Sequence, residues 1–155
     1  MTGRTLIVAA TVVLLTAEAN AQAWITDSKS GCHAWNQNPE PGETVAWDGA
    51  CQNGFAQGHG RLSFYRNGNV GTTLEGEFHD GKLEGYGVVR SADGKVYMGN
   101  FLNGVPSGGG VFVTDDGITL GGDWVNGCAR DDKHVAAIGT PITDCPHPAV
   151  AKFGG

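Results

Sequence analysis

The chain has few basic residues and lacks the spacing patterns of the common catalytic and metal-binding motifs. Lys and Arg number 10 against 16 Asp and Glu, which gives a formal net charge of −6. An acidic chain without a basic patch lacks the electrostatic footprint of a nucleic-acid-binding protein. C-x-x-C, H-E-x-x-H, EF-hand and G-x-S-x-G patterns are all missing. We therefore expect no nucleic-acid partner, no bound metal and no cofactor.

Long apolar runs are also missing, except at the N-terminus. Residues 6–17 form a mostly apolar run, which follows Arg4 and precedes A-x-A motifs at 19–21 and 21–23. This pattern is typical of a secretory signal peptide. We predict that residues 1–21 are the signal peptide, with a second candidate cleavage site after residue 23. The mature chain is then expected to have no transmembrane segment and to be exported, either periplasmic or secreted.

Glycine, in contrast, is abundant and regularly spaced, with 26 residues in a chain of 155. Residues 74–127 repeat with a period of 23, and residues 45–73 form a less regular copy. Each regular unit opens with an apolar residue, a spacer and a glycine, and an aromatic residue follows two positions later: Leu74-Gly76-Phe78, Tyr97-Gly99-Phe101 and Leu120-Gly122-Trp124. Self-similarity of this length indicates an array of stacked supersecondary units.

Asn-Gly and Asp-Gly dipeptides recur at two points of the repeat and predict its local structure. They favour type I′ hairpin turns, in which both central residues take positive φ. They stand at residues 53–54, 67–68, 80–81, 93–94, 103–104, 116–117 and 126–127. Short runs of alternating pattern lie between them. We therefore predict an all-β fold, in which β-hairpins form a single antiparallel, meandering sheet over residues 45–127.

The two flanking segments are expected to cap this sheet. Residues 22–44 contain Pro39, Pro41 and Gly42 and are predicted to be a turn-rich connection that forms an N-terminal cap. Residues 128–155 form a C-terminal cap and tail, with a short helix from Asp131 to Ile138, where Asp131 would be near the helix N-cap.

Four cysteines lie in the mature chain, one pair at each end of the repeats. An even number of cysteines in a small exported chain favours disulfides. Three pairings are possible in principle. Because two cysteines precede or enter the first repeat and two follow the last one, we predict the pairs Cys32–Cys51 and Cys128–Cys145.

The repeat pattern resembles the MORN repeat, roughly Y-x-G-x-F-x-x-G-x-x-x-G-x-G. Residues 97–104 (YMGNFLNG) and 74–87 (LEGEFHDGKLEGYG) carry the resemblance best. It covers residues 45–127 as three repeats and a partial fourth. The flanking cysteine blocks look like those of small exported bacterial proteins of this type. The resemblance implies a scaffold or binding protein, whose partner could be a protein or another envelope component: a peptide, a glycan or a lipid.

The repeated aromatic residues are the candidate binding residues. One interpretation is that they form the sheet's own core together with the caps. The other is that one face leaves some of them exposed, as a groove for a peptide, a glycan or an acyl chain. The candidate set is Trp47, Phe78, Tyr86, Tyr97, Phe101 and Trp124.

A small hydrolase is the alternative function. Glu75 and Glu77 would point to one face of a strand, and two carboxylates on one face can form a glycosidase pair. Asp80 and the histidines His59 and His79 are the other candidates for this chemistry. A solvated acidic face is the simpler interpretation of these residues. No catalytic residue is therefore assigned, and we expect a non-catalytic binding or scaffold protein.

Overall fold

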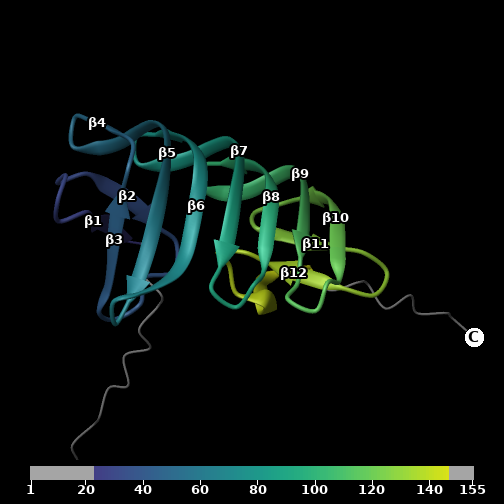
Figure 1. Cartoon of the computed structure of the whole chain (residues 1–155). Coiled ribbons are helices and arrows are strands. Elements are labelled where there is room, and N and C mark those ends of the chain that lie inside the picture. The colour runs from purple at the N-terminus through teal and green to yellow at the C-terminus, as the bar shows by residue number, and fades with distance from the viewer. Residues whose placement is uncertain (1–22, 147–155) are drawn as a thin grey trace, which may run out of the picture.

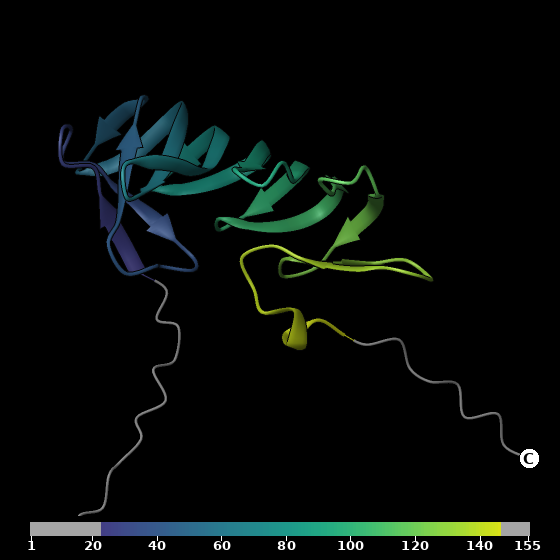
Figure 2. The ribbon, with the colours of Figure 1, turned by 60° about the horizontal axis from the view of Figure 1, so that its bottom comes forward.

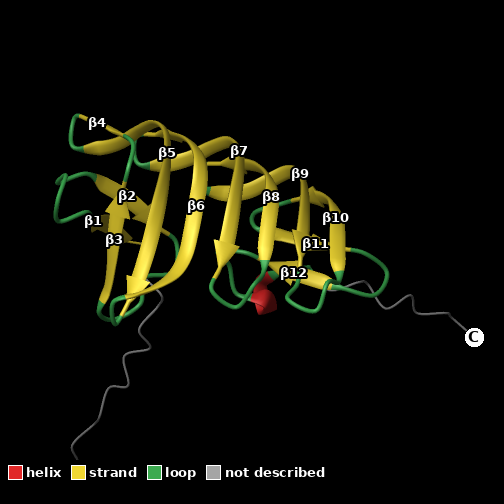
Figure 3. Cartoon of the chain, viewed as in Figure 1, coloured by secondary structure: helices red, strands yellow, loops and turns green. Residues whose placement is uncertain are grey.

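The computed structural model describes residues 23–146, and almost all of its regular structure is β (Figures 1 and 3). The predicted meander is confirmed: β5 to β10 follow one another in the sheet, each antiparallel to the next. The elements are β1 (Ala23–Thr26), β2 (His33–Asn36), β3 (Glu43–Trp47), β4 (Ala50–Gln52), β5 (Phe55–Arg66), β6 (Asn69–His79), β7 (Lys82–Ser91), β8 (Val96–Leu102), β9 (Val105–Val113), β10 (Thr119–Trp124), β11 (Cys128–Arg130), β12 (Val135–Ala137) and the 3₁₀ turn η1 (Ile142–Asp144).

The predicted type I′ backbone is confirmed at five of the seven turns. In each of them an Asn or Asp has φ near +50° and the following glycine also has positive φ: residues 53–54, 67–68, 80–81, 103–104 and 126–127. Asn, Asp and Gly tolerate this backbone conformation, so the hairpins close with two-residue turns. The predicted signal peptide lies outside the described residues.

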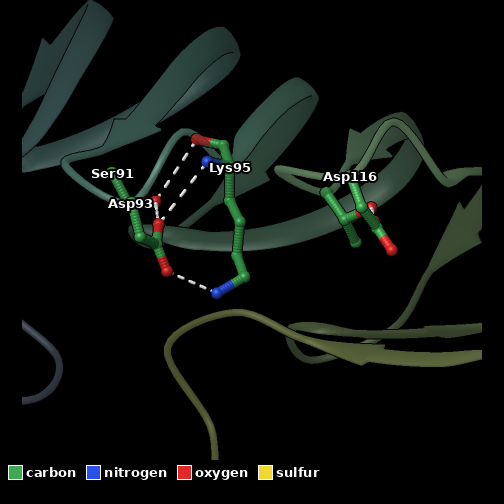
Figure 4. A network of polar contacts seen from close by, with 5 residues as sticks. Ser91, Asp93, Lys95 and Asp116 are labelled. Atoms are coloured by element: carbon green, nitrogen blue, oxygen red, sulfur yellow. Dashed lines mark hydrogen bonds and ion pairs between the residues drawn. The ribbon is translucent and has the colours of Figure 1, made fainter.

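The prediction is wrong for Asp93-Gly94 and Asp116-Gly117, where only the glycine has positive φ. Here the loop has three residues: Gly94 N–H donates to the Ser91 carbonyl, and Ser91 N–H donates to the Lys95 carbonyl, each at 3.0 Å. Side-chain hydrogen bonds within the loop favour this three-residue form, because the Asp93 carboxylate accepts hydrogen bonds from Lys95 and Ser91 (Figure 4). These bonds lower the pKa of Asp93 to about 2.

A row of glycines crosses the sheet and makes room for large side chains on one face. Gly60, Gly76, Gly87, Gly99, Gly110 and Gly122 are paired in register from β5 to β10. We call the face with the buried side chains the inner face. There the Tyr97 ring lies against Gly99 and Gly110, where a Cβ at Gly110 would be 2.8 Å from Tyr97 Cζ. The glycines are needed because the rings occupy the Cβ positions.

The core is made by the inner face and the two caps. Beside the repeat residues it contains Cys32 and Ala34 of the N-terminal cap and Ala129 and Ala136 of the C-terminal cap. Figure 2 shows the two caps on the same side of the large sheet. A single-layer sheet has to bury one face against another layer, and the caps supply that layer.

Both caps are anchored on the turns at one end of the hairpins. His33 N–H donates to the Gly54 carbonyl and Trp35 N–H to the Gly81 carbonyl, each at 2.8 Å. From the other end of the chain, Ile138 N–H donates to the Gly127 carbonyl, also at 2.8 Å. The caps meet where the Gln37 amide lies against Gly139. This contact is so close that a Cβ at Gly139 would overlap the Gln37 side chain.

The structure corrects two predictions for the caps and confirms the disulfides. The N-terminal segment is more regular than predicted, since β1 and β2 pair and join the sheet at β5. The predicted helix from Asp131 to Ile138 is wrong: β11 and β12 form a hairpin there. The Asp131 carboxylate accepts from the Lys133 and His134 N–H groups and closes a turn instead of a helix. The pairs Cys32–Cys51 and Cys128–Cys145 are present.

The buried Asp27 carboxylate ties the N-terminal cap to the sheet. It accepts hydrogen bonds from Ser30 Oγ at 2.6 Å, from Lys29 N–H at 3.1 Å and from Trp47 N–H at 3.5 Å. Burial raises the pKa of Asp27, but the hydrogen bonds from Ser30, Lys29 and Trp47 outweigh it and hold the pKa below its usual value.

We expect Asp27→Asn to destabilise the protein at pH 6 by about 1 to 3 kcal/mol and to matter less in acid. Because the folded-state pKa is lowered, this stabilisation is fully present above the unfolded-state pKa of about 4. It is lost as the pH falls through the lower folded-state pKa. Urea unfolding at pH 6 and in acid would measure the loss of stability in the variant and its decrease with pH, with the exposed Asp132→Asn as control. A difference between variant and wild type that stays constant with pH would contradict this account.

Candidate binding groove

Five of the six candidate aromatic residues lie inside the core. Trp47 packs edge-on against Phe78, with ring centroids 4.6 Å apart. Tyr97 packs edge-on against Phe101 at 5.3 Å and against Trp124 at 4.8 Å. All five are at most 7% exposed. Their placement agrees with the interpretation that they form the sheet's own core with the caps.

Tyr86 is separate from the other five. It is 63% exposed and follows the alternation of β7 onto the outer face, opposite the face that carries Val89 and Leu83. Its register partner on β8 is Asn100. Of the six candidate aromatics, Tyr86 alone can therefore contact a partner directly in this conformation.

The residues of the hydrolase alternative are exposed and do not surround a cavity. Glu75 forms an ion pair with Arg61 at 2.8 Å, and both side chains are about half exposed. The hydrogen bond and charge of Arg61 lower the pKa of Glu75, whereas a general acid needs a raised pKa. His79 and Asp80 contact each other at 3.3 Å with largely exposed side chains. This geometry gives the hydrolase alternative no support.

Between the caps, three adjoining cavities form one groove on the inner face. Their volumes are about 530, 220 and 330 Å³. Asn38 and Gly139 line both the first and the second cavity, and Glu43 and Phe64 line both the second and the third. We call this the cap groove. It runs from the C-terminal cap at Asp144, past the loop between β2 and β3, to the turn at Asp93.

The floor of the cap groove is apolar and its walls are polar. The apolar residues Phe64, Leu74 and Val105 come from the sheet. Leu74 packs against the core but is only partly buried. The walls carry side-chain amides and hydroxyls, which can both donate and accept hydrogen bonds: Asn36, Gln37, Asn38, Asn126, Thr72 and Thr140.

Glu43 is the charged residue at the centre of the cap groove. Asn36 Nδ2 donates to its Oε2 at 2.6 Å, and Glu40 N–H donates to the same atom at 3.4 Å. These bonds fix the position of the carboxylate without neutralising it. Within residues 23–146, neither Glu43 nor Asp144 forms an ion pair, and the groove cation Arg66 is paired with Glu40 at 2.9 Å. Glu43 and Asp144 are therefore carboxylates of the groove without an ion-pair partner among these residues.

Sequence reasoning did not identify this groove. Apart from Thr72 and Asn126, its wall residues lie in the segments around residues 36–43 and 139–144, outside the repeat. Their only sequence signal is the turn composition of the β2–β3 loop, which shows a loop but not where it folds. Among residues 23–146, no group of three or more His, Cys, Asp and Glu side chains could hold a metal ion, and no helix there is long and apolar enough to span a membrane.

Comparison with protein families supports the repeat assignment. The MORN repeat model matches residues 49–69, 75–96 and 97–119. These ranges follow the successive hairpins from β4 to β9, so the chain contains three MORN repeats. The partial fourth unit, which begins at Leu120, lies outside these matches. A search of curated proteins found no match to the chain.

Proposed function

We propose that this chain, with its three MORN repeats, is an exported, non-catalytic binding module. In this proposal the cap groove holds an extended basic segment of a partner polypeptide. The observation that carries it is the continuous groove, which combines an apolar floor, amide walls and the unpaired carboxylates of Glu43 and Asp144. MORN repeats are compatible with a binding or scaffold role. The two disulfides are compatible with an exported protein.

The charge of the groove favours a basic polypeptide over the other ligand classes. Amide side chains can pair with the N–H and C=O groups of an extended backbone. Unpaired carboxylates attract Lys and Arg side chains and repel acidic ones. A neutral glycan would not depend on these charges, and an acyl chain would need a larger apolar lining. The buried aromatic residues act here by shaping the sheet beneath the groove.

A pair of labelled peptides would test the proposal. We expect an extended peptide of alternating Val and Lys to bind about two- to fivefold more tightly than its Val and Glu counterpart, as one favourable charge contact provides. Glu43→Gln combined with Asp144→Asn should remove most of this preference, because Gln can still accept the Asn36 hydrogen bond. Fluorescence anisotropy at low and high salt would measure both effects.

Asp132→Asn is the matched control, because it removes one charge from the β11–β12 turn, outside the groove. Equal affinity for the two peptides, or a Lys preference that the groove variant keeps, would contradict the proposal. Variants such as Tyr97→Ala and Trp124→Ala are unsuitable for this purpose. Both side chains are core residues, and their loss would report on folding.

A further inference from the structure

The large sheet ends differently at its two sides. On the N-terminal side, β5 pairs with β2, β3 and β4, and β1 pairs with β2. A disulfide ties Cys32, directly before β2, to Cys51 in β4. On the C-terminal side, β10 is the last strand and, within residues 23–146, pairs only with β9. Up to residue 146, the chain does not return along β10 after the turn at Asn126-Gly127. Instead β11 pairs with β12, and Figure 2 shows this hairpin below the sheet.

The free edge of β10 presents the backbone groups of alternate residues. Thr114 N–H donates to the Ile118 carbonyl in the loop between β9 and β10. Even-numbered residues of β10 therefore bond to β9, and Thr119, Gly121 and Asp123 point their N–H and C=O groups away from it. Val125 continues this alternation, because it exchanges both backbone hydrogen bonds with Cys128 on the outer side.

This edge lacks the features that usually prevent strand pairing. Natural edge strands carry Lys, Pro or a bulge, whereas β10 reads TLGGDW and has one charge, at Asp123. Gly121 and Gly122 leave its centre without side chains, and a Cβ at Gly122 would have no heavy atom within 4 Å. Two exposed apolar residues flank the strand, Ile118 (40% exposed) and Val125 (65% exposed).

We propose that β10 pairs antiparallel with β10 of a second copy of this chain, with a twofold axis at Gly121. In this register Gly121 faces Gly121 of the second copy, and Thr119 faces Asp123. The two Asp123 carboxylates are kept apart, and each lies beside a Thr119 hydroxyl that can donate to it. On the inner face Leu120 lies opposite the open position at Gly122. The outward backbone groups of all three residues become paired.

The register also sets the size of the assembly. Residue 125 would lie opposite residue 117, which precedes the first residue of β10, so the Val125–Cys128 bridge lies beyond the paired strand segment. A twofold contact uses the same edge on both chains and is therefore closed. In a pair of this kind each β10 edge is occupied by the other copy, so this contact stops at two copies. This inference is independent of the cap groove.

Light scattering after size-exclusion chromatography would test the pairing. We expect the wild-type protein to have the mass of two chains at micromolar concentration. Gly121→Lys should have the mass of one chain, because two ammonium groups would face each other at the axis. The Cβ of this variant would meet only Val111 Cγ2, at 3.8 Å, so the single chain tolerates it. Thr73→Lys, on β6 with both neighbouring strands paired, is the control and should remain two chains.

Cysteine crosslinking would test the register. All four cysteines of the chain are in disulfides, so an added cysteine reports its own neighbour. A mixture of Thr119→Cys and Asp123→Cys proteins should form a disulfide-linked dimer within the range of pair distances that a disulfide accepts. Each variant alone should form it much more slowly. A wild-type protein of single-chain mass would overturn the proposal, as would crosslinking that is equally fast in each variant alone.

Discussion

Tyr97→Ala is expected to lower the free energy of unfolding by about 3 to 5 kcal/mol, the range for deleting a buried aromatic ring. The Tyr97 side chain is 1% exposed and lies between the rings of Phe101 and Trp124. Beneath it are Gly99 and Gly110, which have no side chains to move into the space. The cavity would therefore stay open, and the full cost of the lost contacts would be measured.

Urea unfolding followed by tryptophan fluorescence and circular dichroism would measure this loss. Tyr97→Phe is the matched control, because it keeps the ring and removes the hydroxyl that donates to the Asn100 carbonyl at 3.2 Å. It should cost about 1 kcal/mol. Burial raises the pKa of Tyr97 to about 12, so the control removes a neutral group. A loss below about 1 kcal/mol for Tyr97→Ala would contradict the assigned core.

Removal of either disulfide is expected to destabilise the protein by about 3 kcal/mol, as the closure of a loop of this length predicts. Cys32 and Cys51 are 19 residues apart, and Cys128 and Cys145 are 17 apart. The Cys32–Cys51 bond joins the N-terminal cap to β4, whereas the Cys128–Cys145 bond joins β11 to the residue after η1 within the C-terminal cap. Cys32 and Cys145 are both buried. Loss of a bond raises the conformational entropy of the unfolded chain and removes one buried sulfur, that of Cys32 or of Cys145, from the folded chain.

Double alanine variants of each cysteine pair, unfolded with and without a reductant, would measure the two contributions. The Cys32→Ala/Cys51→Ala protein should still respond to reductant through the remaining bond, and the reverse should hold for the other pair. The wild-type protein should lose about the sum of both effects on reduction, since the two sites are far apart. An unfolding midpoint that reductant leaves unchanged would contradict a stabilising role for both bonds.

The predictions that succeeded rest on short-range chemistry. Asn and Asp tolerate positive φ and glycine favours it, so Asn53-Gly54 and Asp80-Gly81 specify their turns with no help from distant residues. Once these turns are placed, the period of 23 fixes the order of the strands. The disulfides followed because each pair of cysteines lies at one end of that ordered array.

The predictions that failed depend on distant contacts. Asp131 is as suitable for a helix N-cap as for a turn, and the pairing of Val135 with Arg130 decides between them. The path of the N-terminal segment is set by the Gly54 and Gly81 carbonyls, more than 20 residues beyond His33 and more than 40 beyond Trp35. No periodicity marks such contacts, so the groove between the caps could not be found from the sequence.

Because Gln37 of the N-terminal cap contacts Gly139 of the C-terminal cap, the number of repeats between the caps is limited. Each added unit would insert two strands between them, which separates the caps by about 10 Å. The hydrogen bonds to Gly81 and Gly127 could both survive, but the caps would no longer touch and the inner face would be uncovered between them. The length of this array is thus limited by the reach of its ends, although each hairpin could in principle be followed by another.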